Sequence, residues 1–298
     1  LYNCLIGYNK FIEKKLSQWG EVYNFGMVDT EEKGRTAGEF FNKSNVDIVF
    51  SHAATYYTSA CVLPVHQINK APVVILNLQP TPEMAYEITG TDRWLAQCVG
   101  CSVPEISNAF NRAGIPFRVV NGLLGLYETP TFAKADEVTE KRPEAMKAWK
   151  EIEEWCVAAS VQRTLKWSRF GFLGGYYSGM LDMYSDFTML QAQTGMDVEI
   201  LEMSDLDYYL KSVTEKEVQQ KLQQIQDFFE ISGDSPSDPI ARKPSQDQLN
   251  WSARVASAQE KMVRDRNLDS VSYYYHGRDD YFETVQSGFI VGFSLLNA

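Results

Sequence analysis

The segment 169–206 constrains the fold of this chain more than any other. It contains a short apolar run (170–173) closed by Gly174 and Gly175, a helical pattern near 184–193, and a second apolar run (198–203). A buried run, a glycine turn, a helix and a second buried run are typical of a right-handed βαβ unit. The glycine turn would open at the carboxyl edge of the first strand, where open α/β sheets bind their ligands.

The first half of the chain also alternates strands and helices. Helical patterns cover 1–20, 30–43, 59–69 and 102–113. Short apolar strands are expected at 22–28, 47–50, 73–78 and 117–120. Ser102 followed by Glu105 predicts an N-cap and a capping box for the helix that ends at Gly114. Apolar strands indicate a parallel sheet with helices on both faces, although the strand that would normally precede the first helix is missing.

The second half continues the pattern after a break. Residues 121–142 lose the periodicity and gain charge and proline, so they are the best candidate for a linker or insertion. Helical patterns follow at 143–165, 214–229, 246–266 and 282–297, with a strand at 271–275. The sequence therefore predicts an α/β protein of two doubly wound domains, 1–166 and 167–298, with mainly parallel sheets covered by helices on both faces.

The last helical pattern is apolar to its end, GFIVGFSLLNA. We expect this helix to expose an apolar face, formed by Phe289, Ile290, Phe293, Leu295 and Leu296. An uncovered apolar patch of this kind favours association. The sequence is therefore expected to be a fragment, in which something covers this face in the intact protein.

Composition places the chain among globular proteins and excludes several partners. Hydrophobic residues make up 44% and charged residues 22%, as in a folded domain rather than a disordered chain. The net charge of −11 repels nucleic acid over most of the surface. Because no apolar run approaches about 18 residues and no basic region precedes an apolar core at the N-terminus, we expect no membrane span and a cytoplasmic location.

Five cysteines without a signal segment indicate reduced thiols. Cys98 and Cys101 form a C-x-x-C pair. A zinc site would need a second pair or histidines at ligand spacing, and none follows. A redox dithiol stays open, but a structural role is favoured because the pair lacks a preceding strand and a nearby basic residue.

The three histidines are far apart in the sequence. His52 and His276 each lie just past a predicted strand, where sites of this fold gather, whereas His66 is expected on a helix face. Gly174, Gly175 and Gly179 do not form the dinucleotide fingerprint, because their spacing is wrong.

Tyrosines stand at the same strand ends, at 56–57, 176–177 and 273–275. A phenol can face the C–H surface of a sugar and bond to its hydroxyl groups, although such residues can equally serve packing alone. Asn77 and Gln79 supply amide groups at the end of the third strand. Sugar binding at the strand ends is the hypothesis that these residue types favour.

Several segments also resemble a known family. Three motifs are similar to the middle domain of the L-arabinose/L-fucose isomerase family, in particular its arabinose-isomerase-like branch. They are Gly-Tyr-Tyr-Ser-Gly-Met-Leu-Asp at 175–182, Tyr-Ser-Asp-Phe-Thr at 184–188 and Leu-Glu-Met at 201–203. Four further segments resemble the same family in the same order: 46–65, 71–80, 101–115 and 270–277. The resemblance covers nearly the whole chain, apart from an insertion at about 123–142.

The resemblance implies a function and a set of site residues. The family interconverts an aldose and a ketose through an enediol at a divalent metal, usually manganese, in a homo-oligomer whose pocket is shared between subunits. Its substrate-binding positions correspond here to Gln79, Tyr56, Met180 and either Tyr275 or His276. The family's metal ligands would lie beyond residue 298, in a C-terminal catalytic domain that this chain lacks. We therefore assign no catalytic or metal-binding residue and expect the chain alone to be inactive.

Two alternatives remain. Two doubly wound domains with a cleft between them also describe sugar-binding or sensing modules. The chain could instead be a pseudoenzyme that assembles with a full-length partner. Which sugar is used, and whether the assembly is a tetramer or a hexamer, stays open.

Overall fold

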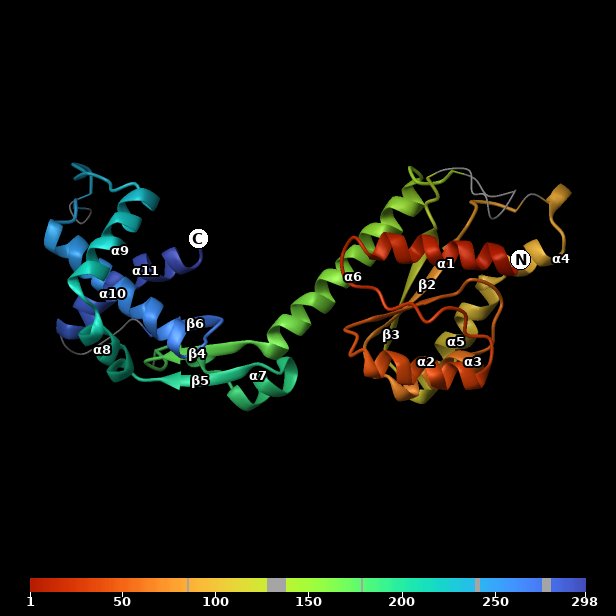
Figure 1. Cartoon of the computed structure of the whole chain (residues 1–298), viewed down its shortest axis with the longest axis horizontal. Coiled ribbons are helices and arrows are strands. Elements are labelled where there is room, and N and C mark those ends of the chain that lie inside the picture. Colours follow the sequence, from red (N-terminus) through yellow and green to blue (C-terminus); the bar gives the residue numbers. More distant parts are fainter. Residues whose placement is uncertain (85, 128–137, 178, 239–241, 275–279) are drawn as a thin grey trace. The chain divides into compact units, whose positions relative to one another are not determined.

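A computed structural model describes residues 1–84, 86–127, 138–177, 179–238, 242–274 and 280–298, with the backbone only at 280–287 (Figure 1). It divides into two compact units, Leu1–Arg163 and Thr164–Ala298. The division lies close to the boundary predicted after residue 166, inside one long helix. Each unit is built on a small sheet whose described strands all pair in parallel. The predicted α/β fold with parallel sheets is therefore confirmed.

The first sheet contains β1 (Val49–His52), β2 (Val73–Gln79) and β3 (Phe117–Leu123) in the order β1-β2-β3. The central strand β2 reads VVILNLQ, which is apolar and rich in β-branched residues, as expected of a strand covered on both faces. Because the three strands run in the same direction, their last residues lie along one edge of the sheet.

The first unit has helices on both faces of this sheet (Figure 1). The helices of this unit are α1 (Tyr2–Leu16), α2 (Glu31–Lys43), α3 (Ser59–Ile68), η1 (Tyr86–Ile88), α4 (Thr91–Ala96), α5 (Val99–Ala113) and α6 (Pro143–Trp167). On one face, Tyr8 of α1 and Ile152 of α6 pack with Leu76. On the other, α3 and α5 contribute Val62 and Phe110. The sheet is thus buried between two helical layers, and α2 packs on α3.

The strand predicted at 22–28 is wrong, so the described sheet has three strands and not four. Asn24 accepts a hydrogen bond from the backbone N–H of Gly26, and its amide donates to Asn9 and Glu13 of α1. Gly26 has a φ of 94°. The resulting turn breaks the extended run, and Phe25 packs on α2 instead.

The predicted linker at 121–142 is also partly wrong. β3 continues through Leu123, and Leu124 and Leu126 are buried. The indole Nε1 of Trp149 donates to the Leu124 carbonyl at 2.6 Å. The first part of the segment therefore belongs to the core of the first unit, and residues 128–137 lie outside the described part.

The second sheet contains β4 (Arg169–Leu173), β5 (Asp197–Leu201) and β6 (Ser270–Tyr273) in the order β5-β4-β6. The other elements of this unit are η2 (Leu181–Met183), α7 (Phe187–Thr194), α8 (Met203–Ser212), α9 (Glu215–Phe228), α10 (Gln246–Asp265) and α11 (Asp280–Leu296). The βαβ unit predicted for 169–206 is present as β4, α7 and β5. The second strand ends earlier than predicted, because the Asp205 carboxylate accepts the N–H of Glu202 and starts α8.

The core of the second unit lies between its sheet and the helices α8 to α11. Phe289 of α11 is only 1% exposed and packs edge-on against Tyr273. The prediction that the last helix exposes Phe289 is therefore wrong, and Phe293 and Leu295 are half-buried against the same core. Ile290 and Leu296 are exposed as predicted, at 68% and 40%. Among the described helices, none is both long and apolar enough to span a bilayer.

Candidate functional site

The carboxyl edge of the first sheet carries a row of amide side chains. Asn77 of β2 is paired in register with Asn121 of β3, and its Nδ2 donates to the Asn121 Oδ1 at 2.6 Å. The Oδ1 of Asn77 is buried and has no hydrogen-bond partner among the described residues. A buried acceptor without a partner costs about 1–3 kcal/mol. This oxygen is closed to solvent, so the accessible amide groups of this row belong to Asn121 and Gln79.

Gln79 ends β2 two residues after Asn77, so both side chains lie on the same face of the sheet. Gln79 is half-buried, and its backbone carbonyl accepts the N–H of Leu124 at 2.8 Å. Its position at a strand end, with part of the side chain accessible, agrees with the position predicted for it. Its role as a sugar ligand stays a prediction.

His52 ends β1 but lies on the opposite face. Its register partner is Leu76, which belongs to the core under α1 and α6. Its Nε2 is buried and unpartnered among the described residues. Burial lowers the pKa of His52 to about 4, and the nearby Leu78 carbonyl offsets part of that effect, so the ring is neutral at pH 7. The sheet therefore separates His52 from Asn77 and Gln79.

The loop after β1 holds Tyr56 and Tyr57. Tyr56 is 46% exposed. Tyr57 packs with the core under α3 and α5, and burial raises its pKa to about 12. Of the two phenols, only that of Tyr56 is placed to meet a ligand from solvent.

A corner between α4 and α5, residues Leu95 to Ser102, holds this loop in place. The Thr55 hydroxyl donates to the Leu95 carbonyl at 3.0 Å, and the Tyr57 N–H donates to the Ser102 hydroxyl at 3.1 Å. The α4–α5 corner also reaches the loop after β2, because the Gln97 amide donates to the Thr81 hydroxyl at 3.1 Å. One structural element thus positions two of the strand-end loops.

The predicted capping box at Ser102 and Glu105 is wrong. α5 begins at Val99, so both residues lie inside the helix. Ser102 binds the loop after β1, and Glu105 accepts hydrogen bonds from the N–H and the hydroxyl of Ser59. The polar residues that suit a local cap are used instead to hold another part of the chain.

The second sheet offers a different candidate site. In the order β5-β4-β6, the chain passes from β4 to β5 on one side and later returns to β6 on the other side of β4, so the switch point lies between the carboxyl ends of β4 and β6. Gly174 and Gly175 follow β4 with φ values of 83° and 99°. The ring of Tyr177 stacks on Tyr274, with centroids 6.4 Å apart. A Cβ on Gly179 would lie 2.6 Å from the outer end of the Tyr177 ring, so a larger residue there would displace this ring.

The remaining predicted site residues are distributed as follows. Met180 is 51% exposed, and its N–H donates to the Tyr177 carbonyl at 3.2 Å. It belongs to the second unit, whereas Gln79 belongs to the first. Tyr275 and His276 lie outside the described residues. His66 lies in α3, as predicted, on the face that is buried in the core, where it is 3% exposed and meets Phe110 edge-on.

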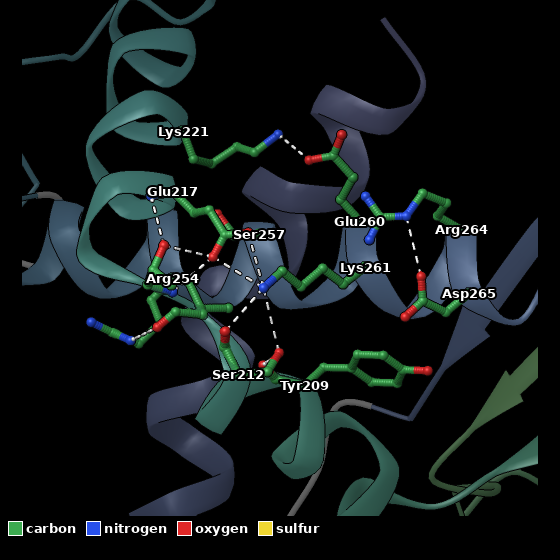
Figure 2. A network of polar contacts seen from close by, with 12 residues as sticks. Tyr209, Ser212, Glu217, Lys221, Arg254, Ser257, Glu260, Lys261, Arg264 and Asp265 are labelled. Atoms are coloured by element: carbon green, nitrogen blue, oxygen red, sulfur yellow. Dashed lines mark hydrogen bonds and ion pairs between the residues drawn. The ribbon is translucent and has the colours of Figure 1, made fainter.

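A network of polar contacts lies elsewhere, among α8, α9 and α10 (Figure 2). The Lys261 ammonium contacts the Ser212 carbonyl at 3.0 Å and the Glu217 carboxylate at 2.9 Å. Glu217 also accepts the N–H of Thr214 at 2.7 Å, and this bond, followed by Lys261, lowers its pKa to about 2. The network joins the end of α8 to the start of α9, which is a structural role.

Within the described part of the chain, no group of three or more His, Cys, Asp or Glu side chains could hold a metal ion. Comparison with protein-family models and with curated proteins finds no match.

Proposed function

We propose that the carboxyl edge of the first sheet binds a small polyol, a pentose or a 6-deoxyhexose, as part of an aldose–ketose isomerase of the L-arabinose/L-fucose type. The observation that carries the proposal is the half-buried Gln79 at the carboxyl end of β2, beside the amide pair of Asn77 and Asn121. A sugar presents several hydroxyl donors, and amide side chains can bond to them as acceptor and donor. The resemblance of the segments 46–65 and 71–80 supports the same edge.

In this proposal the residues of the first unit bind and orient the sugar. Gln79 offers its amide to the sugar hydroxyls as hydrogen-bond donor and acceptor, Asn77 holds the neighbouring Asn121 by a hydrogen bond, and Tyr56 covers a C–H face of the sugar with its ring. A divalent metal, when bound in the intact enzyme, would supply stabilisation of the negative charge that develops on the sugar oxygens. Because the described residues do not provide a group of metal ligands, we assign no residue of this chain to the metal or to proton transfer.

Calorimetric titration of the purified chain with L-arabinose and L-fucose tests the proposal. We expect binding at millimolar concentrations, weakened about fivefold in Gln79→Leu, because the loss of one hydrogen bond to a ligand costs about 1 kcal/mol. Gln223→Leu is the matched control, since Gln223 lies in the second unit and bonds only its helix neighbour Asp227 among the contacts that the structure shows. The proposal would be overturned if the chain bound neither sugar, or if Gln79→Leu and Gln223→Leu bound the sugar equally well.

A further inference from the structure

The two cysteines of the C-x-x-C pair meet at the start of α5. Cys98 is the N-cap residue, and Cys101 lies three residues further on. Their Sγ atoms are 3.3 Å apart, with the Cys98 thiol donating to the Cys101 sulfur. A disulfide requires an S–S distance of about 2.05 Å. The sulfurs therefore need to approach by only about 1.3 Å, which side-chain rotation and a small backbone adjustment can supply.

Two features of the turn that carries the pair favour this adjustment. Pro104 lies inside α5 and has no N–H to donate to the carbonyl four residues earlier, at Gly100. A Cβ built on Gly100 would meet no atom within 4 Å, so the turn is open to solvent on that side. The first turn of α5 thus lacks one helical hydrogen bond and is open on the side of Gly100.

The two thiols differ in accessibility. Cys101 is exposed and Cys98 is half-buried. The hydrogen bond that Cys98 donates to Cys101 raises the pKa of Cys98 above its usual value of 9.0, so Cys98 keeps its proton longer. Cys101 is therefore the thiol that a reagent from solvent meets first.

We propose that Cys98 and Cys101 form a reactive dithiol that a small-molecule disulfide, such as oxidised glutathione, converts reversibly to an intramolecular disulfide. The Cys101 thiolate attacks one sulfur of the small disulfide and releases one thiolate. Cys98 then gives up its proton and attacks the Cys101 sulfur, and the second small thiolate leaves. The two cysteines are oxidised, the small disulfide is reduced to two thiols, and those thiols take up the two protons.

The same turn belongs to the α4–α5 corner. The Cys98 N–H donates to the Leu95 carbonyl at 3.1 Å, and that carbonyl also accepts from the Thr55 hydroxyl. Ser102, directly after Cys101, accepts the N–H of Tyr57. A disulfide across this turn would restrain the groups that hold the loop after β1. The redox state of the pair is thereby linked to the order of that loop.

Incubation of the purified chain in glutathione redox buffers, followed by alkylation and mass spectrometry, tests the dithiol. We expect the peptide with Cys98 and Cys101 to lose two hydrogens and resist alkylation, while Cys61 and Cys156 stay free. Burial raises the pKa of Cys156 to about 11, which makes it a slow internal reference. The Cys98→Ser variant should form only a mixed disulfide between Cys101 and glutathione. The Cys156→Ser variant should form the Cys98–Cys101 disulfide like the parent chain. A parent chain that remains fully alkylated in excess oxidised glutathione would overturn the proposal.

Amide hydrogen exchange tests the link to the loop without any sugar. We expect the N–H of Tyr57 to exchange several-fold more slowly in the oxidised chain than in the reduced chain. The variant Cys98→Ser should show the same exchange under both conditions. Equal exchange in the oxidised and reduced parent chains would refute the link.

Discussion

The carboxylate of Glu105, in α5, accepts two hydrogen bonds from Ser59, the first residue of α3, each 2.9 Å long. Thr58, the N-cap residue of α3, makes no side-chain capping bond. Glu105 therefore caps α3 from the neighbouring helix α5, and it places a negative charge at the positive, N-terminal end of α3. The contact fixes α3 and α5 against each other beside the loop that holds Tyr56.

We expect Glu105→Ala to lower the free energy of unfolding by about 1 kcal/mol, the usual effect of losing a helix cap. Urea denaturation followed by circular dichroism would measure the change. Glu154→Ala, at an exposed position of α6, is the matched control and should change stability by less than about 0.5 kcal/mol. Equal effects of the two substitutions would contradict the capping role.

The contact between α2 and α3 depends on a glycine. A Cβ on Gly34 would lie 2.2 Å from the backbone oxygen of Cys61, which cannot move aside cheaply. We expect Gly34→Ala to destabilise the chain by about 1–3 kcal/mol, the range for overpacking. Gly100→Ala, with open space around its Cβ, should leave stability unchanged or raise it by up to about 1 kcal/mol. Thermal unfolding of the two variants would decide the comparison.

The sequence was most informative where a pattern was long. The helices around 31–43, 143–167 and 246–265 follow from apolar spacing and their caps, because one face of each must be buried. The error at 22–28 has a tertiary cause. Its residues have strand propensity, but the turn at Asn24 depends on Asn9 and Glu13 in another helix, contacts that a local pattern cannot show.

The candidate site could be predicted only in part. Gln79 and Asn77 stand out because they follow an apolar run, and their position at the edge of the sheet agrees with that reading. Asn121 was missed, since the predicted strand ended at residue 120 and Asn121 was assigned to the linker. The pattern of Ser102 and Glu105 suited a local capping box, but their partners, Tyr57 and Ser59, lie more than forty residues earlier.

The buried His66 predicts a loss of stability in mild acid. Burial lowers its pKa to about 4 from 6.5, so the unfolded chain binds a proton more readily than the folded one. The stabilisation is complete above pH 6.5 and is lost as the pH falls toward 4, and His52 acts in the same direction. We expect His66→Leu to lose less stability than the parent chain between pH 7 and pH 5. Identical pH profiles in urea denaturation would contradict this assignment.

Glu217 predicts a second, more acidic transition in the second unit. Its folded pKa of about 2 lies below the usual 4.5, because it accepts the Thr214 N–H and pairs with Lys261. A lowered carboxyl pKa stabilises the fold above pH 4.5, and this contribution is lost as the pH falls toward 2. Since the Glu217 side chain is 35% exposed, solvent screening limits the loss in free energy of unfolding caused by Glu217→Gln to about 1 kcal/mol at pH 7.

Hydrogen exchange of the first amides of α9 should rise several-fold in Glu217→Gln and stay unchanged in Glu230→Gln, whose side chain is exposed beyond the end of α9. If both variants exchange like the parent chain, the network of Figure 2 does not stabilise the start of α9.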